Sequence, residues 1–195
     1  NRKEFLRRAI HSVLRQTLPN VRIYLTDDGS TDGTERLFAK DAEFDRADID
    51  YRRLPENVSS KITPAGSHPW IGPVINAGLK RITKETHVSY LDDDSTYDPH
   101  FLERMVEMIE TEDLDFAWGA QEAWLRNDPT PTFFDYPLFQ RPGYVSGTSL
   151  VHRREVLKRV GLWLESPDPS RPEPIDWNFI RRLREAGFKG ALVPN

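Results

Sequence analysis

The chain has 195 residues, of which 30% are charged and 37% hydrophobic, which suffices for one domain with a buried core. Its formal net charge of -4 argues against a nucleic-acid-binding protein, since such proteins carry a basic face. The absence of cysteine excludes disulfides and thiolate chemistry, and no apolar run approaches the ~20 residues that span a bilayer.

Helical and strand patterns alternate along the first part of the chain. Apolar side chains recur at helical spacing over residues 4–16, 70–82 and 101–109. Strand-like stretches lie over residues 21–26, 49–54, 88–91 and 116–118, and a loop is expected over 55–69. This alternation predicts an α/β fold with a mostly parallel sheet and helices on both faces.

Two pairs of residues carry helix-start signals. Asp32 and Glu35 have the spacing of a capping box, in which each side chain bonds the backbone of the other. Asp98 is followed by Pro99, which is the order of an N-cap and a first-turn proline. We therefore expect one helix to begin at Asp32 and another at Asp98.

The last part of the chain is rich in proline. Eight of the fifteen prolines fall between Pro129 and Pro174, which predicts long irregular loops. Among and after these loops we expect a strand over 146–152, a short helix over 153–160, a helix over 176–186 and a strand over 191–193.

Three consecutive carboxylates, Asp92, Asp93 and Asp94, follow the apolar strand over 88–91. Adjacent carboxylates repel by roughly 4 kcal/mol per pair at ~4 Å and an effective dielectric of ~20. A solvated loop could carry them, but a hard divalent cation such as Mg²⁺ or Mn²⁺ accounts better for three acids at a strand end. We favour the metal site.

Two other acidic positions each allow two interpretations. Asp27 and Asp28 precede Gly29 at a strand end, where they could bind a base or a ribose or simply form hydrogen bonds within a turn. Asp176, at the expected helix start, could be a first-turn acid stabilised by the helix dipole or a general base. Ligands of parallel sheets bind beyond the carboxyl ends of the strands, where Asp27 and Asp92 both fall.

Three stretches, in this order, resemble the family 2 inverting glycosyltransferases. They are NR with LRRAIHSVLRQT and DDGSTDGT; LDDDS with the following Asp98-Pro99; and SGTSLVHRREVLKRVG with the later Asp176-Trp177 and Arg182-Leu183. The resemblance covers nearly the whole chain. Within the family, the third stretch is similar to enzymes of the bacterial spore-coat polysaccharide type.

The resemblance implies a GT-A fold and transfer of a sugar, with inversion, from a nucleoside diphosphate donor (UDP or dTDP) to an acceptor hydroxyl in polysaccharide or glycoconjugate synthesis. It implies one cytoplasmic catalytic domain over 1–195, with a nucleotide-sugar-binding half over 1–115 and an acceptor-binding half over 116–195. Neither nucleic acid nor a membrane-spanning segment is expected.

Carried over residue by residue, the resemblance implies that Asp28 binds the pyrimidine base and Asp93 the ribose. Asp94 is implied to bind a Mn²⁺ or Mg²⁺ ion on the diphosphate. The resemblance makes Asp176 the catalytic base. Asp27 and Asp92 are assigned to the same donor pocket, and Lys61 is the candidate for a basic donor contact.

The chain departs from the family pattern in three ways, one of which is that the basic donor contact expected over 55–69 has no clear match beyond Lys61. The family's first strand, which ends in a Thr-x-Asn-Arg type of stretch, is expected before Asn1 and is not in this sequence. Ile175-Asp176 stands where the family often has Glu-Asp, so the base assignment rests on one acid.

Other functions remain open from the sequence. A catalytically silent nucleotide-sugar-binding module would keep the same fold, and a sugar-nucleotide nucleotidyltransferase or a receiver domain would also place acids at strand ends. The aromatic segment 127–144 is expected either to serve the acceptor or to cover the sheet.

Overall fold

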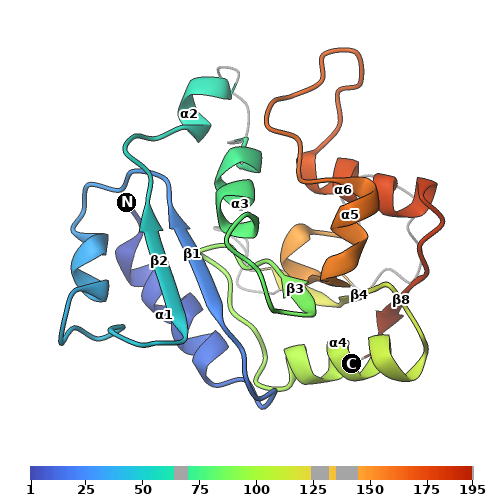
Figure 1. Ribbon diagram of the computed structural model, residues 1–195, viewed down its shortest axis with the longest axis horizontal. Coiled ribbons are helices and arrows are strands. Elements are labelled where there is room, and N and C mark those ends of the chain that lie inside the picture. Colours follow the sequence, from blue (N-terminus) through green and yellow to red (C-terminus); the bar gives the residue numbers. More distant parts are fainter. Residues whose placement is uncertain (64–69, 124–131, 135–144, 195) are drawn as a thin grey trace.

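The computed structural model describes residues 1–63, 70–123, 132–134 and 145–194 (Figure 1). Within these ranges the α-helices are α1 (Lys3–Leu14), α2 (Ser59–Ile62), α3 (Gly72–Leu79), α4 (Phe101–Thr111), α5 (Leu157–Val160) and α6 (Ile175–Glu185). The strands are β1 (Ile23–Asp27), β2 (Ile49–Arg53), β3 (His87–Ser89), β4 (Phe116–Gly119), β5 (Gln121–Ala123), β6 (Thr132–Phe134), β7 (Leu150–Arg153) and β8 (Gly190–Val193). Short 3₁₀ helices are η1 (Thr34–Phe38), η2 (Gly147–Ser149) and η3 (Arg154–Val156).

The described chain has three sheets, of which the smallest is the antiparallel pair of β5 and β6. β1 and β2 form a parallel pair, and a four-stranded sheet has the order β3-β7-β4-β8. β4 and β8 are parallel, whereas β7 is antiparallel to both of its neighbours. The first residue of β7, Leu150, lies opposite Trp118 near the end of β4, so β7 has to run back along the sheet. The alternating pattern therefore predicted the parallel pairs, and the mixed sheet comes from β7.

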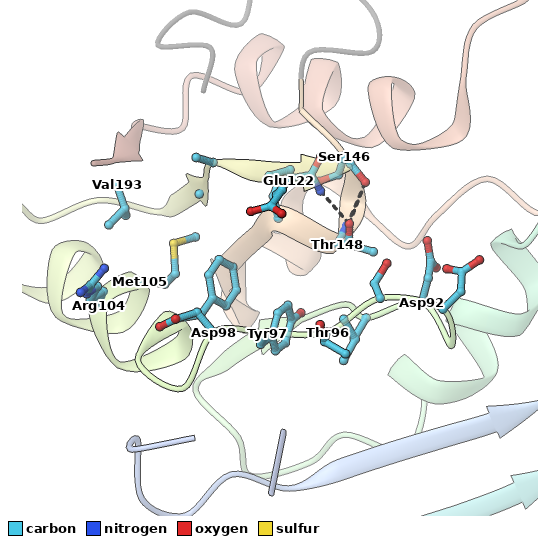
Figure 2. Close-up of a pocket in the computed structure, with 18 of the residues that line it drawn as sticks. Asp92, Thr96, Tyr97, Asp98, Arg104, Met105, Glu122, Ser146, Thr148 and Val193 are labelled. Carbon is cyan, nitrogen blue, oxygen red and sulfur yellow. Dashed lines mark hydrogen bonds between the residues drawn. The ribbon is translucent and has the colours of Figure 1, made fainter. Parts of the chain in front are cut away.

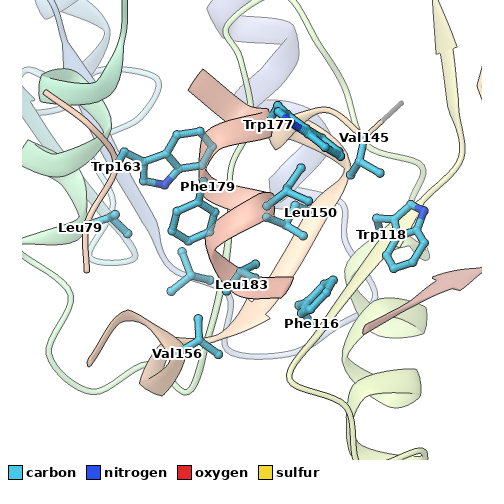
Figure 3. Close-up of a cluster of buried hydrophobic side chains, with 12 residues drawn as sticks. Leu79, Phe116, Trp118, Val145, Leu150, Val156, Trp163, Trp177, Phe179 and Leu183 are labelled. Carbon is cyan, nitrogen blue, oxygen red and sulfur yellow. The ribbon is translucent and has the colours of Figure 1, made fainter. Parts of the chain in front are cut away.

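The four-stranded sheet is covered on both faces, with α4 on one side and α6 on the other (Figure 1). Successive residues of β4 point to opposite faces, as a strand requires. Phe116 and Trp118 belong to a buried cluster with Phe179 and Leu183 of α6 (Figure 3), whereas Ala117 packs in the cluster around α4. Each fully buried side chain of this size stabilises the fold by about 1.5–3 kcal/mol, so this core fixes α6 on the sheet.

The helix expected to begin at Asp32 does not form. The structure has only the 3₁₀ helix η1, whose N-cap is Gly33 and which has no side-chain cap. The Asp32 carboxylate instead accepts hydrogen bonds from the Thr34 hydroxyl at 2.6 Å and from the Lys3 amide at 3.1 Å. Its Oδ1 also accepts the Thr34 amide at 3.2 Å, so the carboxylate bonds the following turn locally and the remote Lys3 as well.

Two further boundaries differ from expectation. α4 begins at Phe101 instead of Asp98, because the Asp98 side chain accepts the His100 amide two residues later and forms a turn. The strand expected over 146–152 begins only at Leu150, since the Ser146 hydroxyl caps the 3₁₀ helix η2 that precedes it. The expected helix over 70–82, by contrast, is present as α3 with a proline in its first turn.

Polar side chains on α1 and just after it hold the segment at the start of α4. The Gln16 amide donates to the Asp98 carbonyl at 2.6 Å, and its oxygen accepts the Leu102 amide at 2.9 Å. Ser12, buried on α1, accepts the Tyr97 amide at 3.1 Å. In the described part of the chain, no helix has the length and apolar character that crossing a membrane requires.

A buried polar pair joins β7 to the segment after β3. His152 is fully buried, and its Nε2 lies 2.8 Å from the Tyr90 hydroxyl. Its Nδ1 lies 2.8 Å from the Arg153 carbonyl oxygen, so Nδ1 carries the proton and Nε2 accepts from Tyr90. Burial lowers the pKa of His152 to about 4, which keeps the ring neutral at physiological pH.

This neutral histidine predicts a pH-dependent stability. Because the folded pKa is about 4 and the unfolded value ~6.5, the unfolded state binds the proton first as pH falls, and the unfolding free energy drops by about 3 kcal/mol between pH 7 and pH 4. In urea unfolding, His152→Gln should lack this contribution. His100→Gln, at an exposed site, should keep the wild-type pH dependence; identical pH dependence in all three proteins would contradict the assignment.

Candidate active site

The three consecutive aspartates lie on a loop after β3. The strand ends at Ser89, so Tyr90 and Leu91 separate it from the acids. Tyr97 closes the loop, because its hydroxyl donates to the Tyr90 carbonyl oxygen at 2.6 Å and lies 2.7 Å from the Ser89 hydroxyl. The acidic turn is therefore anchored to β7 through the hydrogen bond between Tyr90 and His152.

The acids on this turn have perturbed proton affinities. Asp92 is exposed to a cavity but otherwise surrounded by protein, and this desolvation, together with the charges of Asp94 and Asp93, raises its pKa to about 6. Burial also raises the pKa of Asp93, while the positive charge of Arg2 opposes that shift. Burial is the larger cause of both raised pKa values and the neighbouring acids add to it, so a cation at this turn would favour the charged carboxylates.

Arg2 supplies a positive charge at this turn. Its Nη2 lies 2.7 Å from Asp93 Oδ1, and its Nη1 lies 2.6 Å from Asp94 Oδ2. Among the described residues, no three carboxylate or histidine side chains converge as a ready-made metal site. The turn nevertheless fits Mn²⁺ or Mg²⁺, because its two carboxylates already hold a cation and these ions take one or two carboxylates along with phosphate and water oxygens.

Asp176 reaches the same region from the first turn of α6. Its Oδ1 accepts the Trp177 amide at 2.8 Å. Burial raises the pKa of the Asp176 carboxyl, and hydrogen bonds from backbone amides, including that of Gly147, oppose the shift. The charge of Asp176 contributes to the raised pKa of Asp92, so the two carboxyl groups belong to one electrostatic site.

Asp27 and Asp28 are held by hydrogen bonds from the protein itself. Buried Asp27 accepts the Ser30 amide at 2.8 Å and the Tyr51 hydroxyl at 2.7 Å. Asp28 accepts the Val58 amide at 2.7 Å and the Ser59 hydroxyl at 2.5 Å, next to the start of α2. In this state both carboxylates stabilise the loops that follow β1 and β2.

The turn at Gly29 brings these loops together. Gly29 has φ 75°, and a side chain there would place its Cβ 2.8 Å from the Asn57 amide nitrogen. Only glycine allows both the left-handed conformation and this close approach. Lys61, on α2, lies 2.5 Å from Glu56, and its donor role stays a prediction.

A cavity of about 1370 Å³ extends from the acidic turn along the carboxyl edge of the four-stranded sheet (Figure 2). Asp92 and Asp94 line it at one end, and Arg104 and Val193 line it elsewhere. Ser146 and Thr148, on either side of Gly147, also line it and lie near Asp92 in Figure 2. The cavity thus borders both the acidic turn and the segment that contacts Asp176.

Sequence reasoning did not assign roles to Arg2, Tyr97 or His152. Arg2 was noticed only within a motif, since no spacing rule relates it to acids far along the chain. The aromatic segment 127–144 lies outside the described residues, apart from the strand β6. Both of its expected roles therefore stay predictions.

Comparison with known proteins matches residues 1–63 and 66–158 to the family described as Glycosyl transferase family 2. The chain belongs to this family. It is 35% identical over 115 residues to an uncharacterized glycosyltransferase of Nostoc sp. (alr2836), a match that covers 58% of this chain and 31% of that protein.

The family 2 chain also resembles solved structures of TarS from S. aureus. A TarS complex with UDP has a TM-score of 0.72 at 17% identity, covering 98% of this chain and 54% of that chain. A TarS complex with UDP-GlcNAc has a TM-score of 0.68 at 14% identity, covering 98% and 52%. This likeness shows the fold and confirms the expected GT-A class. The chain spans between about a third and about half of these relatives' lengths.

The contacts of Asp28 predict a structural cost on mutation. Asp28→Asn removes the charge that strengthens its hydrogen bonds to Val58 and Ser59, so we expect a loss of about 1–3 kcal/mol in urea unfolding without nucleotide. Glu56→Gln, which affects only an exposed ion pair in the same loop, should cost less than ~1 kcal/mol. Unchanged stability of Asp28→Asn would contradict the structural role.

Proposed function

We propose that this family 2 chain is a metal-dependent inverting glycosyltransferase that uses a UDP or dTDP sugar. The observation that carries the proposal is that Asp92 and Asp94 line one large cavity together with Ser146 and Thr148, which flank the Gly147 whose amide bonds Asp176. The acceptor we propose is a hydroxyl of a polysaccharide or other glycoconjugate, and the enzyme type that of bacterial spore-coat polysaccharide synthesis. The proposed site of action is the cytoplasm.

The proposed donor site lies on the side of β1 and the acidic turn, in the half over 1–115. Asp28 would bind the base, Asp93 the ribose and Asp94 a Mn²⁺ or Mg²⁺ ion, with Asp27 and Asp92 shaping the pocket. The ion, when bound, neutralises charge that develops on the leaving diphosphate. For Asp28 to meet a base, a ligand group has to share or replace its hydrogen bonds to α2.

The proposed acceptor site is the cavity along the half over 116–195. Asp176 would take the proton of the acceptor hydroxyl as its oxygen attacks the anomeric carbon opposite the diphosphate. Its raised pKa makes Asp176 a stronger base than an ordinary aspartate. The amide hydrogen bond from Trp177 fixes Asp176 Oδ1 and so orients the carboxylate.

A thermal-shift screen tests the donor class. UDP or dTDP at about 100 times its dissociation constant stabilises a protein by about 2.7 kcal/mol, which raises Tm by several degrees for a chain of this size. We expect this shift only when Mn²⁺ or Mg²⁺ is also present. A flat response to every nucleotide and metal would count against the proposal, and a shift without metal would remove the metal dependence.

Asp176→Asn tests the catalytic base. Asparagine keeps the oxygen that accepts the Trp177 amide but cannot take a proton, so we expect transfer to fall by about 10² to 10⁴ while UDP affinity stays near wild type. Asp168→Asn, on the exposed loop before α6, where the Asp168 carboxylate bonds the nearby Ser170, should retain activity. Normal turnover in Asp176→Asn would exclude this residue as the base, and normal UDP binding without turnover in wild type would favour a silent binding module.

A further inference from the structure

The segment Asn1–Lys3 lies between the two acidic loops. The Asn1 side-chain oxygen accepts two hydrogen bonds from Thr31, from its backbone amide at 2.6 Å and from its hydroxyl at 3.2 Å. The Lys3 amide donates to Asp32 at 3.1 Å. Residues on both sides of Arg2 are therefore attached to the loop after β1, while the Arg2 side chain reaches the other loop, after β3.

Arg2 contacts two carboxylates at once, with one nitrogen on Asp93 and the other on Asp94. The pairs are only partly shielded, because the side chains of Arg2, Asp93 and Asp94 are 54%, 33% and 46% exposed. A shielded ion pair would be costly to break, whereas a half-exposed pair exchanges partners at little cost. The ion pairs of Arg2 with Asp93 and Asp94 can therefore be exchanged for contacts with another cation at little cost.

The oxygens that Arg2 contacts belong to the carboxylates proposed to meet the metal and the ribose. A Mg²⁺ or Mn²⁺ ion binds carboxylate oxygens at about 2.0–2.2 Å, so at these two carboxylates it would compete for lone pairs with the guanidinium nitrogens, which lie at 2.7 and 2.6 Å. The two cations also repel each other at such a separation. Binding of either cation therefore weakens binding of the other.

We propose that Arg2 is a built-in counter-cation that competes with the divalent metal for Asp93 and Asp94 and moves to the donor diphosphate when metal and donor bind together. This inference rests on the proposed function. Arginine suits both positions, because its planar fork binds carboxylates and phosphates alike. The consequence is ordered use of the site: free metal binds weakly, and metal that arrives with a diphosphate binds well.

Mn²⁺ binding without nucleotide measures the competition directly. Each partly exposed ion pair shifts an equilibrium by roughly 1.5- to 5-fold, so removing both should tighten Mn²⁺ binding by about tenfold. Electron paramagnetic resonance of free Mn²⁺ should therefore show tighter binding by Arg2→Met than by wild type. Arg7→Met is the matched control, since Arg7 is on α1, which begins next to Arg2, but pairs with Glu4 and Glu43, and its Mn²⁺ affinity should equal that of wild type.

A second titration tests the transfer to the diphosphate. At saturating Mn²⁺, Arg2→Met should bind UDP several-fold more weakly than wild type, because the arginine contact to the diphosphate is lost. Arg2→Lys keeps the charge but not the fork, so both of its affinities should fall between those of wild type and Arg2→Met. Urea unfolding of each variant verifies that it is folded.

The outcomes separate this inference from the proposed function. If wild type binds UDP with Mn²⁺ but Arg2→Met binds Mn²⁺ alone no more tightly, the competition is overturned and the proposed function stands. Weaker Mn²⁺ binding by Arg2→Met would likewise overturn it and make Arg2 a positioning residue for the two acids. If no variant binds Mn²⁺, with or without UDP, the metal-dependent function fails and this inference fails with it.

Discussion

The repulsion among carboxylates at the edge of the four-stranded sheet is the constraint on which the site depends. Asp92, Asp93 and Asp94 are consecutive, and the charge of Asp176 adds to theirs. In water such a group would spread apart, since like charges there are free to separate. The fold keeps the acids together by closing their loop through Tyr97 and by placing Arg2 against two of them. A substrate that arrives with a bound cation can neutralise the negative charge of these carboxylates.

The aromatic core fixes the relative position of the acidic turn and α6. Trp163 stacks on Phe179 with ring centroids 4.7 Å apart, and Tyr90 meets both rings edge-on. Tyr90 precedes the acids by two residues, and Phe179 follows Asp176 by three, so one cluster carries both halves of the site. A general base works only within hydrogen-bond reach of its proton, which makes such rigidity part of the chemistry.

Local patterns predicted the elements that depend on neighbouring residues. The stripe of α1, the proline-containing first turn of α3 and the buried strand β4 all occur where periodicity placed them. The helix expected at Asp32 is only the short 3₁₀ helix η1, and the Asp32 carboxylate bonds both the nearby Thr34 amide and the Lys3 amide, which is remote in sequence. Asp27 and Asp28 likewise found partners on β2 and beside α2 that no local pattern reveals.

The sequence by itself determined the alternation of helices and strands, the resemblance to family 2 and the acids worth testing, because these depend on residue type and short spacing. Tertiary structure alone decided which charges meet. The charge of Asp176 acts on the pKa of Asp92, and Arg2 forms ion pairs with Asp93 and Asp94. His152 is buried and bonds Tyr90, two residues before the acidic turn. The physical reason is that electrostatic energy depends on distance in space and on surrounding protein, neither of which is local in the chain.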